Sequence, residues 1–193
     1  MNKKIGLFFG TFNPIHNGHL EIGMCALNNL KLNEIWYIVT PFYGNKKKEN
    51  LIEFKERVNL IRIIENKKII AKDFEKNLSP PYYTINTLNF LKKLSHDFSI
   101  IMGEDNFENI HKWKSYKNIL KDYKIIIYPR EGSKMKNINK NSVKIIESEK
   151  INISSSFILK NFQDYSKIKN MINPKIYDYI KRKNLLKRQN TFK

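Results

Sequence analysis

Two histidines, His16 and His19, stand three residues apart just after a short apolar run and a turn containing glycine and proline. Residues three apart share one face of a helix, so both imidazoles can address a single substrate group. The helical pattern that follows would supply an N-terminus with unpaired N–H groups and a partial positive charge. A strand, a tight turn and a helix that opens on two histidines indicate phosphate chemistry, and nucleotidyl transfer in particular.

The complete stretch over residues 10–19, Gly-Thr-Phe-Asn-Pro-Ile-His-Asn-Gly-His, is far more specific than its two histidines. Gly10 and Gly18 would let a ligand approach the backbone without meeting a side chain. Thr11 and Phe12 would offer backbone N–H groups at the turn. We therefore expect the phosphates of a nucleotide to bind along this stretch.

Two simpler interpretations of the histidine pair remain open, a structural pair and one half of a zinc site. The glutamate of a metalloprotease HExxH motif is missing, and zinc requires a third protein ligand. Cys25, His96 and His111 show no ligand spacing to the pair. The sequence thus predicts no protein-held metal, and Cys25 is expected to be apolar filler in the first helix.

Length and composition favour one domain over residues 1–193, with 41% hydrophobic residues to build a core. No run of 18 apolar residues occurs, so we expect no membrane association. The N-terminus lacks the apolar stretch and cleavage site of a signal peptide. The single cysteine cannot form an internal disulfide, which favours a cytoplasmic protein.

A net charge of +18 raises the alternative of a basic nucleic-acid-binding protein. The lysines are spread along the chain rather than gathered in one arm, and no aromatic and basic RNA-binding motif is present. We therefore expect no specific nucleic-acid partner. A general positive field would still attract polyphosphate substrates.

Apolar runs alternate with helical patterns along the chain. Such alternation predicts an α/β fold, a doubly wound parallel sheet with helices on both faces. Ligands bind such sheets at the carboxyl ends of the strands. The informative residues follow three expected strands, at 10–19, 46–48 and 103–105. The expected strands are 5–9, 34–40, 69–71, 98–102, 124–128 and 143–146, and the expected helices are 19–30, 54–64, 84–94, 107–120 and 174–186.

With these motifs in this order, the chain resembles bacterial-type nicotinate-nucleotide adenylyltransferases of NAD biosynthesis, members of the HxGH nucleotidyltransferase superfamily, over nearly its whole length. The resemblance implies a Rossmann-like fold. The other motifs that carry it are a lysine loop after the second strand, Arg57, Pro81–Leu88, Gly103-Glu104-Asp105 with Trp113, and Ile153–Leu159 within a C-terminal part over 150–193.

The resemblance implies that the phosphate of nicotinate mononucleotide attacks the α-phosphorus of ATP, with Mg²⁺ carried by the ATP phosphates. His16 and His19 would be the catalytic residues. The residues implied in binding ATP or its phosphates are Gly10, Thr11, Phe12, Lys47, Lys48, Gly103, Asp105, Ser154, Ser155 and Ser156. The residues implied in binding nicotinate mononucleotide are Tyr83, Thr84, Trp113 and Arg130. ATP and nicotinate mononucleotide are the expected partners, and homo-oligomerisation stays open.

Two residues depart from the family pattern. Asn86 stands where an aspartate is usual, and Leu159 replaces an arginine expected to touch ATP phosphates. Lys160 is adjacent, but an ammonium is a point charge rather than a planar fork. Three alternatives therefore remain, a related adenylyl- or cytidylyltransferase, a nucleic-acid-binding protein, and an enzyme that kept its fold and lost its turnover.

Overall fold

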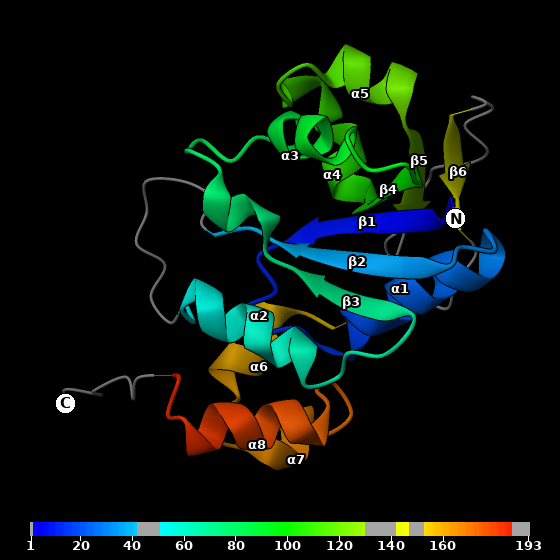
Figure 1. Ribbon diagram of the computed structural model, residues 1–193. Helices are drawn as coiled ribbons and strands as arrows, with labels where there is room; N and C mark the ends of the chain where they lie inside the picture. The colour runs from blue at the N-terminus through cyan, green and yellow to red at the C-terminus, as the bar shows by residue number, and fades with distance from the viewer. Residues whose placement is uncertain (1, 42–50, 130–141, 147–152, 187–193) are drawn as a thin grey trace.

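The computed structural model describes residues 2–41, 51–129, 142–146 and 153–186 of the chain (Figure 1). Lys47, Lys48 and Arg130 lie outside the described residues. The strands are β1 Lys4–Gly10, β2 Glu34–Val39, β3 Ile69–Lys72, β4 Asp97–Gly103, β5 Lys124–Tyr128 and β6 Val143–Ile145. The α-helices are α1 Asn17–Asn29, α2 Phe54–Arg62, α3 Thr84–Leu91, α4 Glu104–Glu108, α5 Tyr116–Asp122, α6 Ser155–Lys160, α7 Tyr165–Ile168 and α8 Pro174–Arg182, and the 3-10 helices are η1 Phe74–Asn77 and η2 Ile110–Lys112.

All six strands form one parallel sheet in the order β3-β2-β1-β4-β5-β6. The chain winds outward from β1 to β3, returns through α3 to β4 beside β1, and then winds outward in the other direction. The order therefore switches between β1 and β4, where ligands bind in doubly wound folds. The predicted fold class is confirmed.

Alternate residues of each strand enter two separate cores, because successive side chains of a strand point to opposite faces. Leu7, Trp36 and Ile100 pack against α3 and α5 on one face. Phe8 and Tyr37 pack on the other face against α1, α2 and the C-terminal helices. Figure 1 shows these two helical layers on either side of the sheet. Both faces are covered, which explains why the strands read as unbroken apolar runs.

The continuous helix expected over 107–120 is wrong. The chain instead forms α4, η2 and α5, with extended backbone at Trp113 and a left-handed residue, Ser115, at φ 57°. The breaks let Ile110 and Ile119 enter the same core. Tertiary packing therefore overrides the helical spacing of the apolar residues.

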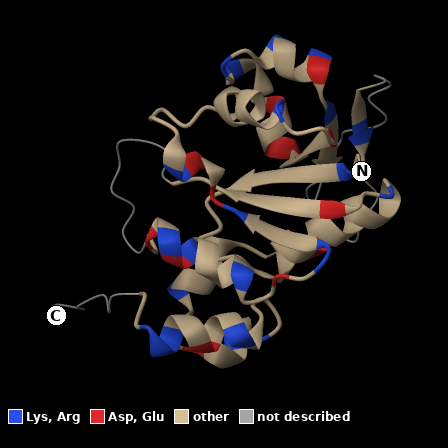
Figure 2. Cartoon of the chain, viewed as in Figure 1, with Lys and Arg blue, Asp and Glu red and all other residues tan. Residues whose placement is uncertain are grey.

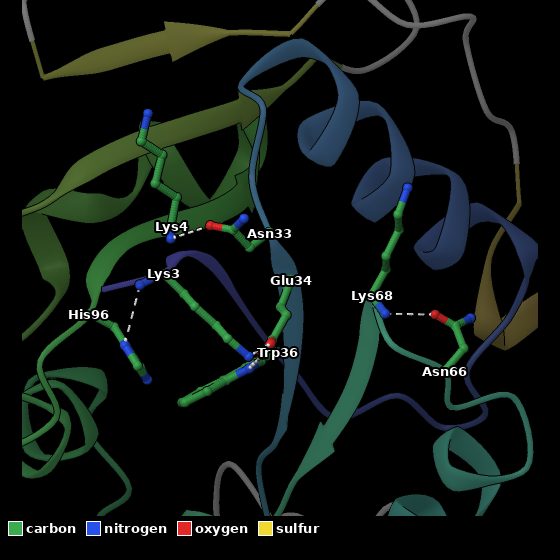
Figure 3. Close-up of polar contacts among 8 residues, drawn as sticks. All are labelled: Lys3, Lys4, Asn33, Glu34, Trp36, Asn66, Lys68 and His96. Atoms are coloured by element: carbon green, nitrogen blue, oxygen red, sulfur yellow. Dashed lines mark hydrogen bonds and ion pairs between the residues drawn. The ribbon is translucent and has the colours of Figure 1, made fainter. Parts of the chain in front are cut away.

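Polar contacts hold the amino ends of the strands, on the edge of the sheet opposite the carboxyl ends (Figure 3). The buried Glu34 carboxylate accepts hydrogen bonds from Lys3 Nζ and from Trp36 Nε1, the latter at 2.8 Å. Burial acts to raise the pKa of Glu34, but these two donors outweigh it and lower the pKa. The Lys4 N–H donates to Asn33 Oδ1 at 2.8 Å. This edge is paired internally and has a structural role.

Basic residues are scattered over both helical layers and over several loops (Figure 2). They do not gather on a single helix in that view, in agreement with their spread along the sequence. Within the described ranges, no helix combines the length and apolar character needed to cross a bilayer.

Candidate active site

The turn after β1 is held by its own aromatic residue. Phe12 adopts φ 47° and buries its ring against Phe8, Tyr37 and His19. A Cβ on Gly10 would come within 2.9 Å of that ring, so a larger residue there would displace the Phe12 ring from its packing. The aromatic ring anchors the turn in the core, which leaves the backbone of the turn at the carboxyl end of β1.

His16 and His19 lie together at the start of α1, as their spacing predicts. His16 is the N-cap residue, and the two rings stack with centroids 3.7 Å apart. The His16 backbone N–H donates to His19 Nδ1 at 3.4 Å. A neutral His19 that accepts at Nδ1 carries its proton on Nε2, so that atom is a hydrogen-bond donor.

His16 is almost completely buried, with 5% of its surface exposed. Among the described residues its Nδ1 has no hydrogen-bond partner. Burial lowers the pKa of His16 from 6.5 to about 4, so the ring is neutral at pH 7 without a ligand. An anion bound beside it would favour the protonated ring and act against that shift.

This burial predicts a pH-dependent stability. The unfolded chain takes up a proton on His16 near pH 6.5 and the folded chain only near pH 4. Stability from this residue is thus complete above pH 6.5 and falls by about 1.4 kcal/mol per pH unit down to pH 4. Urea unfolding at pH 7, 6 and 5 measures it, and His16→Asn should flatten that part of the profile. Parallel profiles for the two proteins would contradict the assignment.

The C-terminal elements brace the histidine turn from a distant part of the sequence. Ser154 caps α6 by accepting the Phe157 N–H at 3.2 Å, and Ser155 Oγ donates to the Pro14 carbonyl at 3.2 Å. The Asn17 N–H at the start of α1 donates to the Met171 carbonyl at 2.8 Å. The structure therefore brings Ser154 and Ser155 to the turn that carries the histidines. Ser156 is exposed on the first turn of α6.

Arg57 holds the other side of the same turn. Its guanidinium is fully buried and donates to four carbonyl oxygens, those of Ile52 and Thr40 at 2.8 Å each and those of Thr11 and Pro41. Burial lowers the pKa of Arg57 to about 10, so it stays charged at pH 7. One side chain thus joins α2 to the ends of β1 and β2. The sequence marked Arg57 only as part of a motif.

A cavity of about 450 Å³ opens at the carboxyl ends of β1, β2 and β4. It brings together five predicted site residues from three separate segments, Gly10, Thr11, Tyr83, Thr84 and Trp113. Its other lining residues are Phe9, Thr40, Glu75, Ile100, Ile101, Met102, Asn106, Lys112 and Lys114. The volume suits a nucleotide-sized ligand.

Glu75 is a cavity residue that the sequence analysis missed. It is 1% exposed, and its Oε1 accepts a 2.8 Å hydrogen bond from Thr87 Oγ1. Burial raises the pKa of Glu75, although hydrogen bonds from the Thr87 and Thr40 hydroxyls act in the opposite direction. A glutamate in a short polar segment gives no sign of burial, because glutamates are nearly always exposed.

Gly103 and Asp105 lie at the end of β4 and the start of α4, beside the cavity rather than among the residues that line it. A Cβ on Gly103 would come within 2.7 Å of Asp105 Oδ1, so the carboxylate folds back over the glycine. Glycine is therefore required for this conformation of Asp105. Both residues are at the same sheet edge as the histidine turn.

The described residues contain no cluster of three or more His, Cys, Asp or Glu side chains able to hold a metal ion. The arrangement offers neutral and cationic donors around one edge of the sheet. Such a set can orient phosphates and stabilise the charge that develops on them.

Comparisons with known proteins show the family to which the chain is similar. The Cytidylyltransferase-like family model matches residues 7–162. A probable nicotinate-nucleotide adenylyltransferase of Flavobacterium psychrophilum is 40% identical over 96% of this chain and 100% of its own length. The corresponding protein of Caldicellulosiruptor bescii is 35% identical over 96% of this chain and 100% of its own.

Solved structures match the whole described fold. Plasmodium falciparum nicotinic acid mononucleotide adenylyltransferase complexed with NaAD has a TM-score of 0.75 and 27% identity. The same protein complexed with APC has a TM-score of 0.74 and 27% identity. Both cover 96% of this chain and 98% of their own.

Proposed function

Since the chain belongs to the nicotinate-nucleotide adenylyltransferase family within the Cytidylyltransferase-like proteins, we propose that it transfers the adenylyl group of ATP to nicotinate mononucleotide. The products are nicotinate adenine dinucleotide and pyrophosphate, in NAD biosynthesis. The observation that carries the proposal is that one short segment, Gly10–His19, joins the cavity to the histidine pair. Its first residues line the cavity, and its last residues begin α1 with His16 and His19.

The reaction requires no covalent intermediate. A phosphate oxygen of the mononucleotide attacks the α-phosphorus of ATP and forms the new P–O bond. The bond from the α-phosphorus to the bridging oxygen breaks, and its electron pair leaves with pyrophosphate. Phosphate oxygen is already a nucleophile at neutral pH, so positioning and charge stabilisation account for catalysis. His19 Nε2 donates to the transferring group, and His16 gains a proton as the phosphates approach.

The mononucleotide occupies the cavity. Trp113 is half-buried beside Tyr83 and presents a large aromatic surface for the pyridine ring. Tyr83 is the N-cap of α3 and Thr84 its first residue, so backbone N–H groups there can bind the nicotinate carboxylate. Asp105, at the start of α4, binds adenosine or ribose hydroxyls.

ATP binds as its Mg²⁺ complex, with the ion held by phosphates and water. Thr11 and Phe12 supply N–H groups. The hydroxyl hydrogens of Ser154 and Ser156 are assigned to the phosphates, whereas the Ser155 hydroxyl, which donates to the Pro14 carbonyl, would exchange that bond for one to a phosphate oxygen. We assign Lys47 and Lys48 to the phosphates and Arg130 to the mononucleotide on the resemblance, because these residues lie outside the described ranges. Since the substrates are intracellular nucleotides, the enzyme acts in the cytoplasm.

Pyrophosphate release from Mg-ATP tests the proposal. Nicotinate mononucleotide, nicotinamide mononucleotide and phosphopantetheine are compared as acceptors under the same conditions. The expected result is much the fastest release with nicotinate mononucleotide. Release only with another acceptor would assign the chain to a related nucleotidyltransferase, and no release from folded protein would favour the inactive alternative.

Leu159→Arg should raise activity severalfold, mainly by lowering the KM for ATP. Leu159 is half-buried on α6 and Lys160 beside it is exposed, and Leu159 is not part of either core of the described residues. An arginine there would restore a planar donor fork that lysine cannot reproduce. Steady-state kinetics at varied ATP measure the effect, with Leu159→Met as the control. An unchanged or higher KM would mean that another group already fills this role.

A further inference from the structure

The charged residues that line the cavity are unevenly distributed. Two of its lining residues, Lys112 and Lys114, are basic and flank Trp113, whereas its acidic lining residue, Glu75, is buried elsewhere along η1. Lys112 Nζ donates to Asn109 Oδ1 at 2.6 Å. Lys114 Nζ instead lies 4.8 Å from the centroid of the Tyr83 ring, and it makes no ion pair with any described residue.

The break between η2 and α5 is what places Lys114 there. Trp113 has extended backbone, and Ser115 turns the chain through a left-handed conformation. In the structure Trp113 and Lys114 line the same cavity.

Tyr83 is also the N-cap of α3, an eight-residue helix with no acidic residue in its first turn. In its first turn the Asn86 N–H donates to the Tyr83 carbonyl at 2.9 Å, and the preceding Thr84 and Ile85 N–H groups have no acceptor within the helix. The ammonium of Lys114 lies near the ring of this N-cap residue, and Lys114, Tyr83 and Thr84 all line the same cavity. The Lys114 ammonium and the N-terminus of α3 are two independent positive features beside the Tyr83 ring. Together they suit a small anion attached to a flat ring.

We propose that Lys114 is a specificity-determining residue, whose ammonium binds the nicotinate carboxylate and so favours the acid over the amide. This inference rests on the proposed function and assigns a side chain to its selectivity. The pyridine ring on Trp113 carries its carboxylate directly, so the next residue along the chain is within reach of it. An amide has no net charge and gains little from an ammonium, whereas a carboxylate gains a charge-assisted hydrogen bond.

The test compares Lys114→Met with Lys117→Met, which removes the same charge from an exposed position on α5 outside the cavity lining. The kcat/KM is measured for nicotinate mononucleotide and for nicotinamide mononucleotide with saturating Mg-ATP. We expect Lys114→Met to lower kcat/KM for the acid about tenfold through KM. Activity with the amide should change less than twofold, Lys117→Met should keep the wild-type preference, and Lys114→Arg should retain most of it.

Three outcomes would overturn the inference. Unchanged kcat/KM for both substrates in Lys114→Met excludes contact with the carboxylate. Equal losses for acid and amide would place Lys114 on the phosphate or in a structural role. The same loss in Lys117→Met would mean that the general positive field, not this ammonium, sets the preference. Wild-type protein without turnover on nicotinate mononucleotide would overturn the proposed function first, and this separates the two failures.

Discussion

His19→Ala should lower kcat by about 100-fold or more while the protein stays folded. The imidazole lies at the N-terminus of α1, with its Nδ1 fixed by the His16 N–H and its ring packed edge-on against Phe12 at 5.0 Å. Nε2 is therefore a pre-oriented donor for a phosphate oxygen. Its hydrogen bond strengthens as charge builds in the transition state, and alanine removes it without substitute.

His96→Ala is the matched control for this experiment. His96 is also half-buried among aromatic rings, but it lies at the amino edge of the sheet, beside Trp36 and Phe98. The His96→Ala variant should keep the wild-type kcat and lose a little stability because its ring contacts are missing. Pyrophosphate release gives kcat, and thermal unfolding checks the fold. A kcat for His19→Ala within a few-fold of wild type would remove His19 from the mechanism.

The sequence predicted the sheet well because β2, β4 and β5 are buried on both faces along nearly their whole length. A continuous apolar run such as residues 125–128 favours a buried strand in a chain where helices alternate with strands. The helical ends were less well predicted. The helix expected over 84–94 stops at Leu91, because the end of a helix depends on contacts beyond the local pattern.

The site was predictable only where its residues are contiguous or belong to a motif. Residues 10–19 carry their own geometry, and the cavity includes Tyr83, Thr84 and Trp113 as expected. The roles of all the site residues stay predictions until they are measured. Glu75 and Lys114 were missed because their placement depends on η1 and on the break at Ser115, which are tertiary features.

Arg57 shows a second limit of sequence analysis. Arginine is normally exposed or paired with a carboxylate, and neither expectation suggests a fully buried organiser of loops. Its partners are backbone carbonyls, which every residue possesses and which leave no trace in the sequence. Only the folded chain, with β1, β2 and α2 in place, reveals what the guanidinium binds.

Arg57→Met should therefore lower the free energy of unfolding by about 4 kcal/mol. The substitution keeps the apolar stem but leaves the carbonyls of Thr11, Thr40, Pro41 and Ile52 without their buried donor. Arg57→Lys should lose less, because an ammonium retains the charge but cannot span four acceptors in different directions. Urea unfolding at pH 7 gives the values.

Arg62→Met provides the comparison on the same helix. Arg62 is half-exposed at the end of α2, and its ion pair with Asp73 is 3.8 Å long, so its loss should cost less than about 1 kcal/mol. Under conditions in which the variant is still folded, Arg57→Met should also lower kcat/KM more than tenfold, since Thr11 and Thr40, whose carbonyls Arg57 binds, line the cavity. An equally small loss in the free energy of unfolding for Arg57→Met and Arg62→Met would contradict this role of Arg57. Water or neighbouring groups would then have to satisfy those carbonyls, and the packing of Phe12 would determine the conformation of the turn.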